Sequence, residues 1–135
     1  MPLQLRSTIT SDGDLQLTLV DIETPAPAAD EVVIRVEATP INPSDLGLLL
    51  GPADMARAER SGTAEVPIVT APVPPALLPM ATPRFDESMP VGNEGAGTVV
   101  EAGSDPEAQA LLGTTVAVLG REIYSQFRVV KAADC

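Results

Sequence analysis

The sequence contains no histidine and only one cysteine, Cys135. Catalytic zinc sites use His, Cys and carboxylate ligands, and structural zinc sites usually need four Cys or Cys together with His. Neither kind of zinc site is expected here. A single cysteine also excludes an internal disulfide, and it fits a protein of the reducing cytoplasm, which is the location we expect.

Aromatic and basic side chains are also scarce. The aromatic residues are Phe85, Tyr124 and Phe127, and 8 Lys and Arg face 19 Asp and Glu, for a net charge of −11. The core must therefore consist of Val, Leu, Ile and Ala, whose β-branched members favour strands. The acidic excess argues against nucleic acid, which binds proteins through Lys and Arg, and against anionic membrane surfaces.

No long hydrophobic run is present either. The most apolar stretch, residues 66–80, contains five prolines and cannot form one continuous helix. It is also too short and too interrupted to span a membrane. The amino-terminal residues lack the basic region and apolar region of a secretory signal, so we expect neither secretion nor a membrane partner.

What the sequence does contain predicts a mainly β domain. With 135 residues, 14 Pro and 10 Gly, the chain has the length of one domain with many turns. Residues 3–9 and 15–22 alternate in polarity on either side of Asp12-Gly13-Asp14, which predicts a hairpin. Residues 30–38 give the clearest strand, because Val32, Ile34, Val36 and Ala38 point one way while Arg35 and Glu37 point the other.

The middle of the chain is harder to interpret. Asn42-Pro43-Ser44-Asp45 is typical of a turn, and residues 46–50 are compatible with one helical turn ending at Gly51. Residues 54–60 predict a short helix, residues 66–70 a short strand, and residues 74–82 an irregular Pro-rich segment. Because long structureless loops are uncommon in compact domains, residues 51–90 are expected to pack locally or to cover a site.

Regular patterns return after residue 90. Residues 92–97 predict a turn that enters a strand at residues 98–102. Ser104 and Glu107 have the spacing of a capping box for a short helix that Gly113 ends. Further strands are expected over residues 116–118 and 123–130, separated near Gly120, and so many short strands suggest a barrel or a sandwich.

Three segments, residues 30–45, 90–103 and 113–130, occur in an order that resembles the first domain of the medium-chain dehydrogenase/reductase superfamily. The first resembles a strand and an Asn-Pro-x-Asp turn, the second a Gly-x-Glu-Gly-Ala-Gly turn and strand, and the third a strand pair. This resemblance implies that residues 1–135 form a single GroES-like domain: a partly open β-barrel that is mainly β with short helices.

The resemblance points to the zinc-independent, quinone reductase-like branch. In the zinc-dependent branch a Cys lies near the position of Asn42 and a His at that of Asn93, whereas both are Asn here. The implied chemistry is hydride transfer from NADPH to a quinone or an activated alkene. Asn42, Pro43, Ser44 and Asp45 would then bind the cofactor, with Asn42 near its ribose and amide and Asp45 fixing the turn.

Each of these motifs also has a purely structural interpretation. Asn42-Pro43-Ser44-Asp45 consists of common turn residues. Gly92, Asn93, Glu94, Gly95 and Gly97 are assigned to a structural turn, since glycine permits close backbone approach. Glu94 suits a catalytic carboxylate or one held by an Arg or by backbone amides. No catalytic residue is assigned. Tyr124 has the chemistry of a proton donor, but nothing in the sequence places it in the cleft.

A nucleotide-binding fingerprint is missing from the chain. Gly92, Gly95 and Gly97 give Gly-x-x-Gly-x-Gly, the reverse of the Gly-x-Gly-x-x-Gly that opens a helix in Rossmann domains. We therefore expect this chain to bind no NADPH alone, to need a Rossmann domain as partner, and to associate as a homodimer through an exposed strand edge. The alternative is a stand-alone GroES-like module for binding or oligomerisation, without enzymatic activity.

Overall fold

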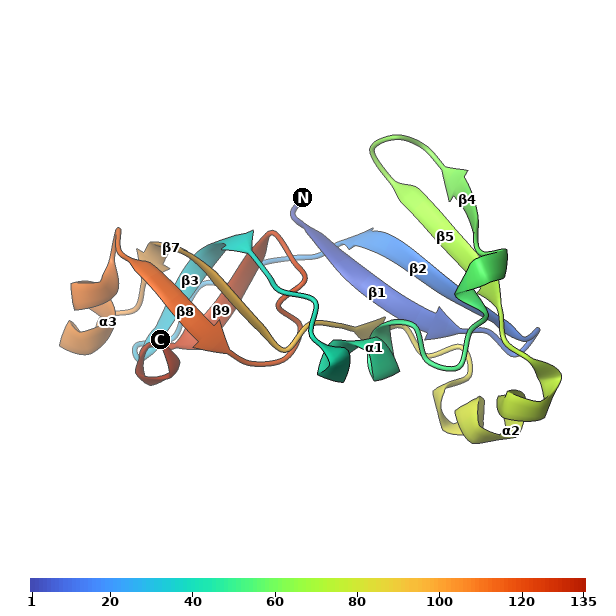
Figure 1. The fold of residues 1–135 in the computed structure, drawn as a ribbon. Helices are drawn as coiled ribbons and strands as arrows, with labels where there is room; N and C mark the ends of the chain where they lie inside the picture. Colours follow the sequence, from blue (N-terminus) through green and yellow to red (C-terminus); the bar gives the residue numbers. More distant parts are fainter. The chain divides into compact units, whose positions relative to one another are not determined.

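The computed structural model describes residues 1–135 and is mainly β with short helices, as expected (Figure 1). Its contacts divide the chain into two compact units, which are described separately below. Unit 1 comprises Met1–Gln4, Asp21–Ile41 and Gly92–Cys135, and unit 2 comprises Leu5–Val20 and Asn42–Val91. The expectation of one GroES-like domain over residues 1–135 stays a prediction.

Unit 1 is built on a four-stranded antiparallel sheet in the order β8-β7-β3-β9. Its strands are β3 (Glu31–Ala38), β7 (Glu94–Ala102), β8 (Thr115–Leu119) and β9 (Phe127–Lys131). The expected strand at residues 30–38 is confirmed, and Val32 and Ile34 are fully buried. They belong to a cluster that includes Val99, Val118 and Ile123, so the fully buried side chains of this core are aliphatic, and Tyr124 packs against them.

Unit 2 contains the larger part of a five-stranded sheet in the order β4-β5-β2-β1-β6. Its strands are β1 (Leu3–Ile9), β2 (Asp14–Asp21), β4 (Glu59–Gly62), β5 (Pro67–Pro72) and β6 (Met89–Pro90). The expected hairpin of β1 and β2 is confirmed, and its turn uses Gly13 at φ +98°. Ile9 and Leu15 from the two strands are fully buried in one cluster with Val73 and Ala81.

The expected turn at residues 42–45 is the beginning of a helix. Helix α1 spans Pro43–Leu49, with Asn42 as its N-cap, so the helix begins three residues earlier than predicted. Proline suits this first helical position because its fixed φ is already helical and it has no N–H to leave unpaired.

Two predictions for the middle segment were wrong. A 3-10 turn covers only Met55–Arg57, and the residues after it form β4, which pairs with β5. The stretch predicted to be irregular consists of the helical turns Pro75–Leu77, α2 (Leu78–Ala81) and Thr82–Arg84. Each of these helical turns has a proline at its first or second position. Proline is tolerated there because the N–H that it lacks would have no hydrogen-bond partner within the turn.

The carboxyl-terminal elements differ from expectation in detail. Helix α3 spans Pro106–Leu111 with Asp105, not Ser104, as N-cap, so the predicted capping box does not form. The expected strand at residues 123–130 begins only at Phe127, because the preceding residues form a turn in which Ser125 Oγ donates to the Glu122 carbonyl. A last 3-10 turn covers Ala132–Asp134.

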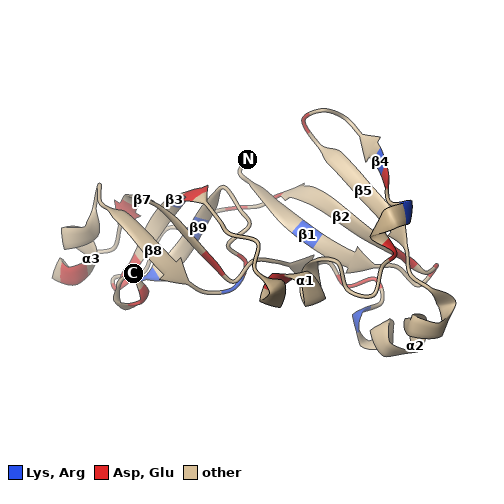
Figure 2. Cartoon of the chain, in the orientation of Figure 1, with Lys and Arg blue, Asp and Glu red and all other residues tan.

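Acidic side chains are distributed over both units (Figure 2). They lie mainly at strand ends, in loops and on the short helices, where water solvates them. None of the helices has the length and apolar character needed to cross a membrane.

Candidate functional site

The Asn42–Asp45 segment is held by the side chain of Asp45. Asp45 is 2% exposed, and its Oδ2 accepts a hydrogen bond of 2.8 Å from the backbone N–H of Asn42. The Asp45 backbone N–H in turn donates to the Asn42 carbonyl at 2.9 Å. Asp45 therefore fixes the first turn of α1, while Asn42 is half-buried and Pro43 and Ser44 are exposed.

The second sequence motif, residues 92–97, lies in unit 1, and only Gly92 and Asn93 precede β7. The assignment of Glu94, Gly95 and Gly97 to a structural turn was wrong, because these residues already pair with β8 as the first part of β7. Gly92 has φ +99°, a conformation that L side chains rarely adopt. A Cβ at this position would also lie 2.5 Å from Cδ1 of Tyr124. Gly92 therefore turns the chain against the Tyr124 ring, and a larger residue would displace that ring.

Tyr124 anchors the segment that follows β3. Its hydroxyl donates a hydrogen bond of 2.7 Å to the carbonyl of Pro40. That proton is engaged with a backbone acceptor, so the geometry gives Tyr124 a role in positioning residues 38–40. The sequence alone could not identify this role, because the two partners are 84 residues apart.

Tyr124→Phe tests this anchor. Losing the hydroxyl removes one hydrogen bond and leaves the ring in place, so we expect a loss of about 1 kcal/mol in the free energy of unfolding. Urea denaturation of both proteins measures the change. An unchanged midpoint would show that the Tyr124–Pro40 bond contributes nothing to stability.

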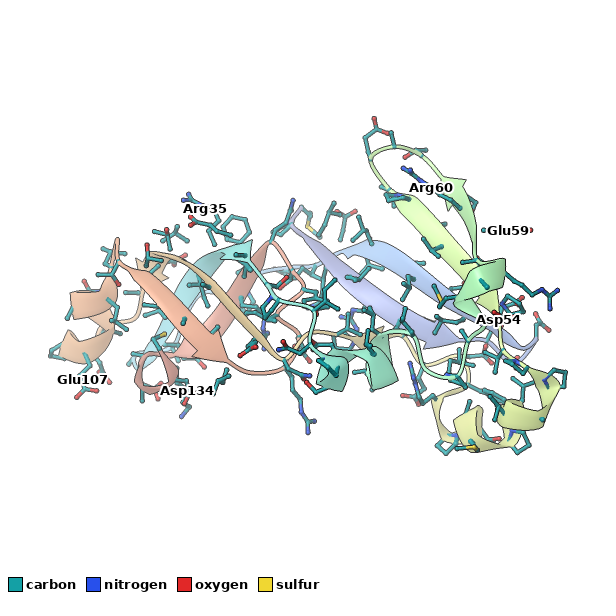
Figure 3. All side chains as sticks on the ribbon, in the orientation of Figure 1. Arg35, Asp54, Glu59, Arg60, Glu107 and Asp134 are labelled. Carbon is teal, nitrogen blue, oxygen red and sulfur yellow. The ribbon has the colours of Figure 1, made fainter.

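A β-bulge lies where β3 and β7 pass beside the motif. Val36 pairs with Gly97 and Ala38 pairs with Ala96, so Glu37 is an extra residue on β3. Glu37 accepts hydrogen bonds of 2.9 Å from Arg35 and from the Thr98 hydroxyl. Arg35 projects from β3 away from the ribbon (Figure 3), so this polar cluster holds the bulge from the solvent side.

The hydrogen bond from Arg35, and after it the one from Thr98, lowers the pKa of Glu37 below its ordinary value of 4.5. A lowered pKa means that the carboxylate stabilises the fold above about pH 4.5 and loses this effect as pH falls through the folded-state pKa. We therefore expect Glu37→Gln to reduce the acid sensitivity of unfolding below that pH. Thermal melts across the acid range measure it; Glu107→Gln on α3 is the control and should leave the sensitivity intact.

Unit 1 contains a cavity of about 690 Å³ beside these elements. Its walls come from the end of β3, the start of β7, the end of β8 and the last turn of the chain. They are mostly apolar, with a hydroxyl from Thr39 and carboxyl groups from Glu94 and Asp134. Such a surface suits an uncharged, largely apolar molecule and disfavours an anion.

The sequence motifs identified only part of this wall. Glu94 and Gly95 line the cavity, but Thr39, Leu119 and Asp134 line it too and carried no signal of their own. The Asn42–Asp45 segment belongs to unit 2, whereas residues 92–97 belong to unit 1.

The acidic side chains and the single thiol give the chain little metal or thiol chemistry. No group of three or more His, Cys, Asp and Glu residues could hold a metal ion. Burial raises the pKa of the Cys135 thiol, and Asp134 raises it further, so the thiolate is disfavoured.

Comparison with solved structures identifies the fold. No family model matches the sequence, and no curated protein matches it. A protein of Mesorhizobium loti described as an NADPH:quinone reductase is similar over 99% of this chain, with 21% identity and a TM-score of 0.55. The JamJ enoyl reductase (21% identity, 99% of this chain, TM-score 0.57) and the CurK enoyl reductase (21%, 98%, TM-score 0.59) are similar as well.

The matching region is the amino-terminal third of these reductases. The chain spans 35% of the Mesorhizobium loti protein and 34% of each enoyl reductase. The fold is therefore the GroES-like fold of the first part of these reductases, as the three sequence segments suggested.

Proposed function

We propose that this chain supplies the substrate-side wall of a zinc-independent, NADPH-dependent reductase that transfers hydride to a quinone or an activated alkene. The observation that carries the proposal is the shared fold with the first third of quinone and enoyl reductases over nearly the whole chain. The mostly apolar cavity in unit 1 supports it, because quinones and enones are uncharged.

The residues present fit one end of such a cofactor. Asn42 carries an amide at the N-cap of α1, where it takes part in a capping box and Asp45 holds its backbone in place, and the proposal places this N-cap against the ribose or carboxamide of the cofactor. When bound, NADPH supplies the hydride. The chain has no Gly-x-Gly-x-x-Gly turn to bind the pyrophosphate, so that part of the cofactor must be held by a nucleotide-binding domain.

The proposal assigns binding and positioning to the chain's own groups. Asn42, Pro43 and Ser44 would contact the nicotinamide end, and Asp45 would fix the start of α1 beneath them. Within unit 1, Tyr124 would hold the chain at Pro40, next to the apolar cavity that would take the substrate.

Turnover tests this function. NADPH oxidation with 1,4-benzoquinone is compared for the 135-residue chain and for a polypeptide that continues along the same reading frame beyond Cys135. We expect turnover only from the longer polypeptide, with a lower kcat/KM in its Asn42→Ala variant and no dependence on added zinc. Turnover by the short chain, or none by a longer chain that binds NADPH, would refute the proposal.

A second candidate, a stand-alone binding module, is favoured by the open edge of β8. The Gly120 N–H donates to the carbonyl of Asn93, just before β7. In an antiparallel pair every second residue bonds to the partner strand, so the backbone groups of Thr115, Ala117 and Leu119 point away from β7. All three are exposed, Leu119 at 77%, and β8 carries no charged residue to discourage pairing.

Self-association through this edge is the expected consequence. Ala117→Lys places a charge in the middle of the edge and should shift a dimer towards monomer. Light scattering measures the mass of both proteins: a closed ring would favour the stand-alone module, whereas a monomer or a loose dimer would favour the reductase domain. A dimer that Ala117→Lys leaves intact would contradict pairing through β8.

A further inference from the structure

Unit 2 contains an arginine whose charge no carboxylate neutralises. None of the three ion pairs in the structure involves Arg84, although the chain has 19 acidic side chains. Its NH2 group donates to the Leu48 carbonyl at 3.1 Å and to the Ser7 hydroxyl at 3.3 Å, both uncharged acceptors. Nε is buried and has no hydrogen-bond partner, and NH1 makes no hydrogen bond.

Holding a partly buried guanidinium with only neutral acceptors costs free energy unless a further group pairs with its charge. Partial burial lowers the pKa of Arg84 by desolvation, which shows that its surroundings disfavour the charge. The carbonyls at the end of α1 offset part of this, as cations near helix carboxyl termini do. Ser7, which is fully buried, gives its own proton to the Leu49 carbonyl and so presents only oxygen to Arg84.

Arg84 also borders a cavity of about 380 Å³ that lies entirely within unit 2. The other walls are glycine and apolar residues: Ile9, Gly47, Gly51, Pro52, Met80 and Ala81. The NH1 group lies 3.4 Å from the point where a Cβ of Gly51 would stand, so the missing side chain leaves the guanidinium accessible from the cavity. The volume is within the usual range of ligand pockets, about 300 to 1,000 Å³.

We propose that this cavity binds a small monocarboxylate with an apolar tail, whose carboxylate pairs with the NH1 group of Arg84. A guanidinium and a carboxylate match in charge and planar geometry. One positive charge beside helix carbonyls suits a monoanion better than a phosphate dianion, and the apolar walls suit a hydrocarbon tail. The lining residues of this cavity differ from Asn42, Pro43, Ser44 and Asp45, although Gly47 lies on the same helix α1.

Octanoate is the probe, measured by isothermal titration calorimetry on the 135-residue chain. We expect saturable binding of one equivalent, with affinity about 10- to 100-fold above that of 1-octanol, which has the same tail without the charge. Inorganic phosphate should bind more weakly than octanoate. No saturable binding of octanoate, or equal affinity for octanol, would overturn the proposal.

Two variants separate binding from folding. Arg84→Met removes the charge and should lower octanoate affinity about tenfold or more, but it also removes a donor to the α1 carbonyls. Gly47→Leu keeps Arg84 and adds a large side chain at the wall of the cavity, which Gly47 lines and where a Cβ meets no atom within 4 Å. It should keep the melting temperature and lower the affinity tenfold or more, whereas Gly47→Ala should bind as the native chain does. Unchanged affinity in Gly47→Leu would overturn the assignment.

Discussion

Gly97→Ala is expected to destabilise the chain by about 3 kcal/mol or more, because the added methyl group would collide with backbone atoms of the neighbouring strand β3. A Cβ at this position would overlap the Arg35 carbonyl oxygen and lie 2.9 Å from the Cα of Val36. Neither atom can move without breaking the pairing of β3 with β7. The bulge at Glu37 brings the two strands this close, so the glycine and the bulge depend on each other.

Chemical denaturation monitored by far-ultraviolet circular dichroism measures this loss. Gly120→Ala is the matched control, since a Cβ at Gly120 meets no atom within 4 Å and its stability should change by less than about 0.5 kcal/mol. If Gly97→Ala unfolds at the same denaturant concentration as the native chain, the close pairing of β3 and β7 described here is incorrect.

Ile123→Ala is expected to cost about 2 to 5 kcal/mol, the range for a large aliphatic residue removed from a core. Ile123 is 1% exposed and packs in the cluster of unit 1. Its Cγ1 lies 2.8 Å from the point where a Cβ of Gly95 would stand, so the side chain occupies the space left by that glycine. The loss should therefore leave a cavity directly beside the candidate site.

The same denaturation experiment measures this effect, with two comparisons. Ile123→Val should cost only about 0.5 to 1.5 kcal/mol, because a single methylene group is lost. Leu119→Ala should be close to neutral, since Leu119 is 77% exposed. Equal losses for Ile123→Ala and Leu119→Ala would show that Ile123 is not a core residue.

The sequence was sufficient to predict elements whose signal lies in neighbouring residues. Val32, Ile34 and Val36 predicted β3 because its core face has a period of two, and Asp12-Gly13-Asp14 predicted the first hairpin because the turn needs glycine at positive φ. Both signals depend on neighbouring residues alone.

Elements that depend on distant partners could not be predicted. Strand β4 (Glu59–Gly62) is exposed along its length and exists because β5 pairs with it, so it has no hydrophobic pattern. The helical turns between Pro75 and Arg84 follow proline positions that are equally common in irregular chain.

The sequence motifs of the candidate site could be predicted, but most of the residues that line its cavity could not. Asn42-Pro43-Ser44-Asp45 was singled out as a turn, but its role as the start of α1 depends on the hydrogen bond from Asn42 to Asp45. The links between Tyr124 and Pro40, and between Arg84 and Leu48, join residues far apart in sequence. Only the folded chain brings such pairs together.

The proposed function depends most on the claim that residues 1–135 form one wall of a dinucleotide site and cannot hold the dinucleotide alone. Titration of NADPH into the purified 135-residue chain, followed by the quenching of nicotinamide fluorescence and by calorimetry, tests it most directly. The account predicts no saturable binding. Tight binding of one NADPH per chain would contradict it.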